Sequence, residues 1–161
     1  MIRDGKVVHE IELPAPPAQV FSMFLDPSRL VRWIGLSADL DPTPGGRFRF
    51  EVQPGQFCEG EYVVVEPPRR LVFTWGWTDP WFGLPPGFSR VEVELEEVSG
   101  GCRLLLVHDQ LPGEIQLLHD EGWSVFLARL EAALRGGDPG AYPQGDPRQR
   151  QRDLRGRGTQ P

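Results

Sequence analysis

Residues 113–135, GEIQLLHDEGWSVFLARLEAALR, make the one long stretch of the chain with helical periodicity. Apolar, aromatic and histidine side chains return every three or four positions along one stripe of it: Leu118, His119, Trp123, Phe126, Leu127, Leu130 and Leu134. Such a stripe is typical of an amphipathic helix that buries one face against another element. Gly136 and Gly137 follow directly, and glycine favours the backbone conformation at which helices end. The spacing therefore predicts one long helix over 113–135.

Before this helix, apolar and polar residues alternate in short runs, which is the pattern of strands with one buried face. The first run is Val7–Leu13. Two short helices are predicted after it, over Ala18–Leu25 and from Pro27 to Trp33, because proline suits the first turn of a helix. Further strands are predicted between turns rich in proline and glycine, over 47–52, 57–66, 71–77, 89–98 and 102–109. Short turns between strands imply an antiparallel sheet, and one long helix beside it indicates an α+β domain of two layers.

Composition bounds the possible functions of the chain. Its 161 residues are enough for one domain with a sizeable core. No apolar run is long enough to span a membrane, and the N-terminus lacks the apolar segment of a signal peptide, so we expect a cytoplasmic protein. The formal net charge of −6 disfavours nucleic acid as the main partner, because phosphate binding needs clustered basic residues. The two cysteines, Cys58 and Cys102, are expected to be free thiols.

The sequence divides into a body, residues 1–137, and a tail, residues 138–161. The tail reads DPGAYPQGDPRQRQRDLRGRGTQP and is rich in proline, glycine and arginine. Ala141, Tyr142 and Leu154 are its apolar residues, which is too few to offset the entropy of ordering the segment. A disordered tail is therefore expected.

Several local strings, taken in order, resemble the START-like superfamily, also called SRPBCC. Within it the chain is most similar to the small bacterial members of the family of activators of the 90-kDa heat-shock protein ATPase. The matching strings are Ala15–Phe21, Leu25–Pro27 with Trp33, Pro44–Phe48, Gly60–Tyr62, Glu66–Trp75, Gly101–His108, and His119 with Gly122–Trp123. The resemblance covers about residues 6–137. It implies a helix-grip fold of order β-α-α-β6-α, in which a curved antiparallel sheet wraps around the long C-terminal helix and encloses an apolar pocket.

The same resemblance implies three classes of function. Members of the superfamily bind lipids, hormones or drugs, polyketide aromatase/cyclases share the fold, and the namesake family acts on a heat-shock ATPase. The first expectation is a binding protein for a small hydrophobic molecule, lipid-like or aromatic and polyketide-like. The alternatives are a cyclase-like enzyme that uses acid/base chemistry and a co-chaperone-like stress protein with a chaperone-type partner. Fold alone does not choose among them.

No catalytic motif is present, and we expect no cofactor and no metal. The sequence lacks the nucleophile elbow, the phosphate-binding loop, the zinc-protease motif and the dinucleotide fingerprint. His9, His108 and His119 each lie on an apolar face, so the three imidazoles could border one interior. They could then hold a metal, transfer protons, or give polarity to a ligand pocket, or each could be a hydrogen-bonded core histidine. Their wide spacing disfavours a metal site.

Aromatic residues are the other candidates for a binding site. Trp75, Trp77, Trp81, Phe82 and Phe88 fall on one predicted strand and the loop after it, where they could stack on a flat ligand or pack in the core. Together with the inward positions of the other strands and of the helix, they give the predicted ligand pocket: Trp33, Phe48, Phe50, Tyr62, Phe73, Trp75, Trp77, Trp81, His108, His119, Trp123 and Phe126.

Overall fold

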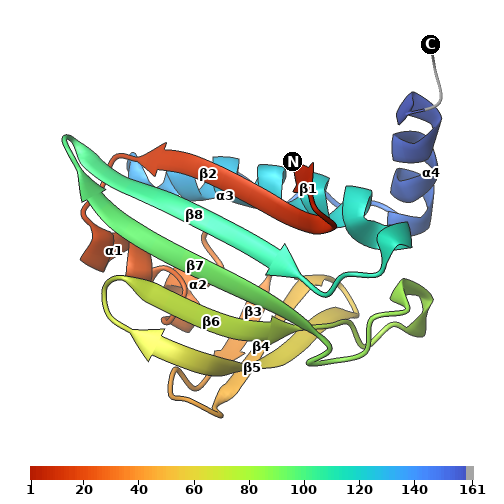
Figure 1. Ribbon diagram of the computed structural model, residues 1–161, viewed down its shortest axis with the longest axis horizontal. Coiled ribbons are helices and arrows are strands. Elements are labelled where there is room, and N and C mark those ends of the chain that lie inside the picture. The colour runs from red at the N-terminus through yellow and green to blue at the C-terminus, as the bar shows by residue number, and fades with distance from the viewer. Residues whose placement is uncertain (159–161) are drawn as a thin grey trace.

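A computed structural model describes residues 1–158 of the chain. The elements in chain order are β1 (Ile2–Arg3), β2 (Lys6–Leu13), α1 (Pro17–Ser22), α2 (Pro27–Leu30), β3 (Ser37–Leu40), β4 (Arg47–Gln53), β5 (Gln56–Glu66), β6 (Arg70–Trp75), η1 (Pro80–Phe82), β7 (Ser89–Val98), β8 (Gly101–Asp109), η2 (Gly113–Ile115), α3 (Gln116–Leu134) and α4 (Pro147–Gly158). The strands form one eight-stranded sheet of order β1-β2-β8-β7-β6-β5-β4-β3, antiparallel throughout. Figure 1 shows this sheet curving across the molecule with α3 behind β2 and β8.

The alternation of side chains along the strands decides which face of the sheet is inside. In β8, Cys102, Leu104, Leu106 and His108 are buried, while the residues between them are half-exposed. The same holds for Val91, Val93 and Leu95 of β7, whose intervening glutamates face solvent. α3 lies against the buried face and contributes Trp123, Phe126 and Leu130 to the core. The interior therefore lies between one curved sheet and one long helix, as in a helix-grip fold.

The two ends of the molecule differ. Figure 1 shows α1 and α2 at one end of the sheet, and the η1 loop and α4 at the opposite end. α2 begins with Asp26 as its N-cap, since the carboxylate accepts from the backbone N–H of Ser28 at 2.9 Å, and Pro27 occupies the first turn. The short helices thus close one end of the grip with regular structure, and the other end is closed by loops and the C-terminal segment.

Most of the predicted element order is confirmed. Two short helices, six strands and one long helix follow β2 in the predicted order. Several boundaries differ. α1 ends at Ser22 and α2 at Leu30, rather than at Leu25 and Trp33, and β3 has no counterpart among the predicted ranges. β6 ends at Trp75, because Gly76 leads into the next loop, and Trp77 makes only an isolated bridge with Cys58. The predicted long helix begins with a separate turn, η2, before α3 starts at Gln116.

Cys58 and Cys102 are both free and buried. They lie on β5 and β8, which are separated in the sheet by β6 and β7. Their placement agrees with two free thiols and with the strand order that the helix-grip fold implies.

The structure describes residues 138–158 of the tail, the segment for which composition predicts disorder, and residues 159–161 lie outside the described part of the chain. The main-chain carbonyls of Pro139 and Gly140 accept hydrogen bonds from the guanidinium of Arg129 at 3.2 and 3.0 Å, and residues 147–158 form α4. Composition indicated too little apolar surface for ordering. The tail instead makes mainly polar contacts with the body, above all with Arg129. Arg129 lies on α3 and is only 9% exposed.

No helix in residues 1–158 combines the length and the apolar character needed to cross a membrane.

Candidate functional site

The end of the interior beside α1 and α2 is filled with aromatic side chains. Phe48 stacks on Phe73 with ring centroids 4.3 Å apart, and Tyr62 meets the edge of Phe48 at 5.5 Å. The Tyr62 hydroxyl donates to the main-chain carbonyl of Phe24 at 2.8 Å, and Trp33 donates its indole N–H to that of Met23 at 3.1 Å. Each ring is less than 2% exposed. This half of the grip is therefore packed core.

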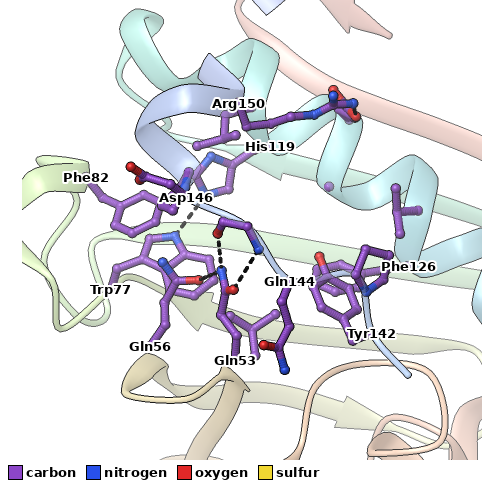
Figure 2. Close-up of a pocket in the computed structure, with 18 of the residues that line it drawn as sticks. Gln53, Gln56, Trp77, Phe82, His119, Phe126, Tyr142, Gln144, Asp146 and Arg150 are labelled. Atoms are coloured by element: carbon purple, nitrogen blue, oxygen red, sulfur yellow. Dashed lines mark hydrogen bonds and ion pairs between the residues drawn. The ribbon is translucent and has the colours of Figure 1, made fainter. Parts of the chain in front are cut away.

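The opposite half contains a cavity of about 560 Å³ between the sheet, α3 and the tail. This volume lies within the range of small-molecule sites. Figure 2 shows Trp77 and Phe82 on one side, Phe126 and Tyr142 on the other, His119 above, and Gln53 and Gln56 below. The described residues that line it are Val52, Gln53, Gln56, Trp75, Trp77, Phe82, Leu118, His119, Glu121, Gly122, Trp123, Val125, Phe126, Tyr142, Pro143, Gln144, Gly145, Asp146, Pro147, Gln149, Arg150 and Asp153.

The walls of this cavity are largely aromatic. Trp77 and Phe82 stack with ring centroids 4.7 Å apart and planes 18° from parallel, while Trp75 lies 5.5 Å from Trp77 and 5.1 Å from Trp123. Polar groups lie at the rim, where Nε2 of Gln53 donates a hydrogen bond to Oε1 of Gln56 at 2.8 Å. The site therefore combines an apolar interior with a polar entrance.

His119 is held by hydrogen bonds from both ring nitrogens. Its Nδ1 lies 2.9 Å from the main-chain carbonyl of Ile115, and because a carbonyl only accepts, Nδ1 carries the proton. Its Nε2 accepts the indole N–H of Trp77 at 3.0 Å. Burial lowers the pKa of His119 to about 4, so the ring is neutral at pH 7.

His108 takes part in a second, parallel chain of hydrogen bonds. Trp123 donates its indole N–H to Nδ1 at 3.0 Å, so Nε2 carries the proton and donates to the Ser89 hydroxyl at 2.8 Å. That hydroxyl donates in turn to the main-chain carbonyl of Trp75 at 2.7 Å. Burial, and then the neighbouring His119, holds the pKa of His108 well below its usual range. Both imidazoles are thus neutral and bonded to protein groups.

Residues 142–150, called the strap here, cross the open side of the cavity. The Gln53 amide donates to the carbonyl of Gly145 at 3.0 Å and accepts its N–H at 3.1 Å, as the dashed lines in Figure 2 show. The ring of Tyr142 lies 5.3 Å from that of Phe126 and is tilted by 31°. Arg148 lies 3.4 Å from the carboxylate of Asp79 and over the ring of Trp81, and Arg150 pairs with Glu121 of α3.

The structure brings only some of the predicted pocket residues to the cavity. Those that line it are Trp75, Trp77, His119, Trp123 and Phe126. Four of the others pack at the opposite end of the interior: Trp33, Phe48, Tyr62 and Phe73. Phe50 packs between the two ends, against Trp75 and Phe126. His108 lies behind Trp123, which donates a hydrogen bond to it. Trp81 lies outside the lining, beneath Arg148, in the loop after the predicted aromatic strand.

The three histidines do not border one interior. His9 lies at the edge of the sheet, where its Nε2 is 2.9 Å from the carboxylate of Asp120 on α3. Only His108 and His119 meet inside, with ring centroids 5.4 Å apart. Within residues 1–158, no three His, Cys, Asp or Glu side chains are placed to hold a metal ion together.

Sequence reasoning missed two parts of the cavity, the rim at Gln53 and Gln56 and the strap. Gln53 and Gln56 flank a turn and gave no signal beyond polarity, although they hold the rim. The strap was missed because its contacts are polar. The available signal was Tyr142, an isolated aromatic residue in a segment that otherwise has Ala141 and Leu154 as its apolar residues.

A model of the family "Activator of Hsp90 ATPase homolog 1-like protein" matches residues 14–135 of the chain. The comparison with curated proteins gave no match.

Solved structures share the fold. An AHSA1-like protein from Rhizobium etli is 39% identical, with 88% of each chain covered and a TM-score of 0.67. CalU16 from Micromonospora echinospora is 26% identical over 92% of this chain and 83% of its own, with a TM-score of 0.69. DynU16, a protein of the dynemicin biosynthetic locus, is 28% identical with a TM-score of 0.73 over 87% of this chain, which spans only 51% of DynU16.

Proposed function

This chain belongs to the family of Activator of Hsp90 ATPase homolog 1-like proteins, and we propose that it binds a small hydrophobic molecule, aromatic or lipid-like, in the cavity between its sheet and α3. The observation that carries the proposal is a cavity of about 560 Å³ with aromatic walls and a polar rim. Sites for small molecules typically join a mostly apolar lining to a few placed polar groups. A flat aromatic body would find stacking surfaces on Trp77, Trp123 and Phe126.

The state of the histidines supports binding more than acid/base chemistry. His119 lines the cavity, but Trp77 and Ile115 use its two nitrogens. His108 is similarly bonded by Trp123 and Ser89. A general acid or base needs a nitrogen or oxygen within hydrogen-bond reach of the substrate, so these contacts favour a binding site over the cyclase-like alternative.

The relatives give this proposal context and a second candidate. DynU16 comes from a biosynthetic locus, which suits a protein that handles a small molecule. The family description names activation of the Hsp90 ATPase, and a chaperone-type partner therefore stays the second prediction. The aromatic cavity favours the small molecule.

Gly122 offers a direct test. It faces the cavity from α3, and a Cβ built there meets nothing within 4 Å, so a larger side chain would extend into the cavity without a clash. Gly122→Leu should keep the fold and weaken binding of naringenin, emodin or palmitic acid at least about tenfold. Ala128→Leu is the matched control, because Ala128 is an exposed position of the same helix.

Binding would be followed by tryptophan fluorescence, since Trp75, Trp77 and Trp123 line the cavity. We expect a shift at micromolar ligand for the wild type and for Ala128→Leu, and a much weaker one for Gly122→Leu. Equal affinities in all three proteins, or no response of the wild type to any of the three compounds, would overturn the proposal.

A further inference from the structure

The strap builds much of the cavity wall without belonging to the core of the fold. Eight of the described lining residues lie in the strap, whereas the sheet and α3 are complete before residue 137. The wall can therefore move away while the hydrophobic core stays packed. The strap crosses the open side of the cavity, so its release would widen the opening, and it is the part of the wall with the least core to disrupt.

The contacts that fasten the strap are separate and mostly polar. They comprise two hydrogen bonds between the Gln53 side-chain amide and the backbone of Gly145, the ion pair Arg148–Asp79, and the ion pair Arg150–Glu121. Arg148 and Asp79 are exposed by 44% and 31% in their side chains. Exposed pairs of this kind contribute little each, so the fastening is weak relative to the core.

One apolar contact joins the strap to the cavity itself. The ring of Tyr142 covers Phe126, and the Arg129 guanidinium lies 5.5 Å from the Tyr142 ring. Burial raises the pKa of the Tyr142 hydroxyl, which stays protonated and uncharged. Tyr142 thus occupies aromatic surface that a ligand would otherwise contact, and it closes the wall beside Phe126.

From these contacts we infer that residues 142–150 are a gate, and that ligand enters and leaves the cavity by release of the strap from Gln53, Asp79 and Glu121. The inference rests on the proposed binding function and adds the route of entry. If the strap is mostly closed in both the free and the bound protein, and ligand passes in either direction only when it opens, the open fraction multiplies the rates of association and of dissociation alike. A change in a fastening contact outside the cavity should then alter both rates and leave the dissociation constant nearly unchanged.

Arg148→Ala tests this prediction, because Arg148 fastens the strap but does not line the cavity. The probe is prodan, an uncharged naphthalene dye whose emission changes in an apolar site. Stopped-flow measurement should show association and dissociation both about three- to fivefold faster than in the wild type, the effect of losing one exposed ion pair and one cation–π contact. Arg135→Ala is the control, since Arg135 makes an exposed pair with Glu131 on α3, 3.0 Å apart, and neither residue lines the cavity.

Cross-linking the strap in its closed position tests the opposite effect, slower entry and exit of ligand. Gly145 has no neighbour within 4 Å of a built Cβ, so the double variant Gln53→Cys, Gly145→Cys can be bridged by the thiol cross-linker dibromobimane. Bridging should slow both rates at least about tenfold relative to the same variant before cross-linking. Unchanged rates after bridging, together with equal rates in Arg148→Ala and Arg135→Ala, would overturn the gate.

A readout without ligand separates this inference from the binding proposal. The amide of Gly145 bonds to Gln53, so its hydrogen exchange reports release of the strap. Faster exchange of the strap in Arg148→Ala than in Arg135→Ala supports opening even if prodan fails to bind, in which case the binding function fails and the strap still opens. Equal exchange in the two variants counts against the gate.

Discussion

At the scale of single residues, two neutral histidines organise the polar part of the interior. Nε2 of His119 accepts a hydrogen bond from the indole N–H of Trp77, and its Nδ1–H donates to the main-chain carbonyl of Ile115. His108 does the same between Trp123 and Ser89. Each ring can make this pair of bonds only when neutral, because a charged imidazole has no acceptor. The two tautomers are opposite, with the proton on Nδ1 in His119 and on Nε2 in His108.

This arrangement predicts a loss of stability in mild acid. The pKa of His119 is lowered from 6.5 to about 4 by burial, so the unfolded chain takes up a proton over this interval and the folded one does not. The free energy of unfolding is therefore complete above pH 6.5 and falls as the pH drops toward 4, by roughly 3 kcal/mol for this residue. Urea unfolding at a series of pH values would measure the slope.

His119→Gln is the informative variant, since an amide also offers one acceptor and one donor but does not titrate. We expect a shallower slope between pH 4 and 6.5. Leu117→Ala serves as the control, because Leu117 is exposed on the same helix, lies outside the cavity lining and does not titrate. A slope as steep in His119→Gln as in the wild type would contradict the assignment.

Trp123 should be the most costly single position of α3. It is 1% exposed, packs on Trp75 and donates to His108. Trp123→Ala should lower the free energy of unfolding by about 3–5 kcal/mol, the cost of removing a buried large aromatic. Trp123→Phe should cost about 1–3 kcal/mol, mainly because it leaves the Nδ1 of His108 without a donor.

Leu117→Ala is the control for these measurements, with its free energy of unfolding determined from the same kind of denaturation curve. Leu117 is 43% exposed on the same helix, so its loss should change the free energy of unfolding by less than about 0.5 kcal/mol. Similar curves for Trp123→Ala and Leu117→Ala would mean that α3 does not seal the interior.

At the scale of elements, the tail and the body should prove separable. A chain ending at Gly137 should still fold, because every strand and α3 are intact without the tail. It should be about 1–2 kcal/mol less stable than a chain ending at Gly158, since it lacks the Tyr142 contact and the carbonyls that accept from Arg129. Circular dichroism and urea unfolding would measure fold and stability. Loss of the sheet signal, or no change in stability at all, would contradict this division.

At the scale of the whole molecule, the thiols report global opening. Cys58 and Cys102 are both buried with no exposed area, and burial raises the pKa of each. Neither should react with Ellman's reagent in the native protein, and two thiols per chain should react in denaturant without reductant. Rapid native reaction would show that β5 or β8 opens locally, and fewer than two thiols after denaturation would show a disulfide.

The order of elements could be predicted because each strand and the long helix has its own apolar period. The cavity could not, for two physical reasons. Periodicity tells which side chains turn inward but not how the interior is filled, so Phe73 and Trp75 gave the same signal although one packs in the core and one lines the cavity. The strap has no period at all, since the hydrogen bonds of Gly145 to Gln53 and the ion pairs of Arg148 and Arg150 hold it in place of burial.

The separation in sequence between the core of the fold and much of the cavity wall also has a consequence for evolution and design. The residues that make the domain fold and a large share of those that line the cavity lie in different stretches of the chain, before 137 and from 142 to 153. Mutations in the later stretch, or its exchange for another, would reshape the cavity while leaving the core intact. A designer could therefore change the proposed ligand preference within about a dozen positions, by grafting strap sequences onto one unchanged scaffold.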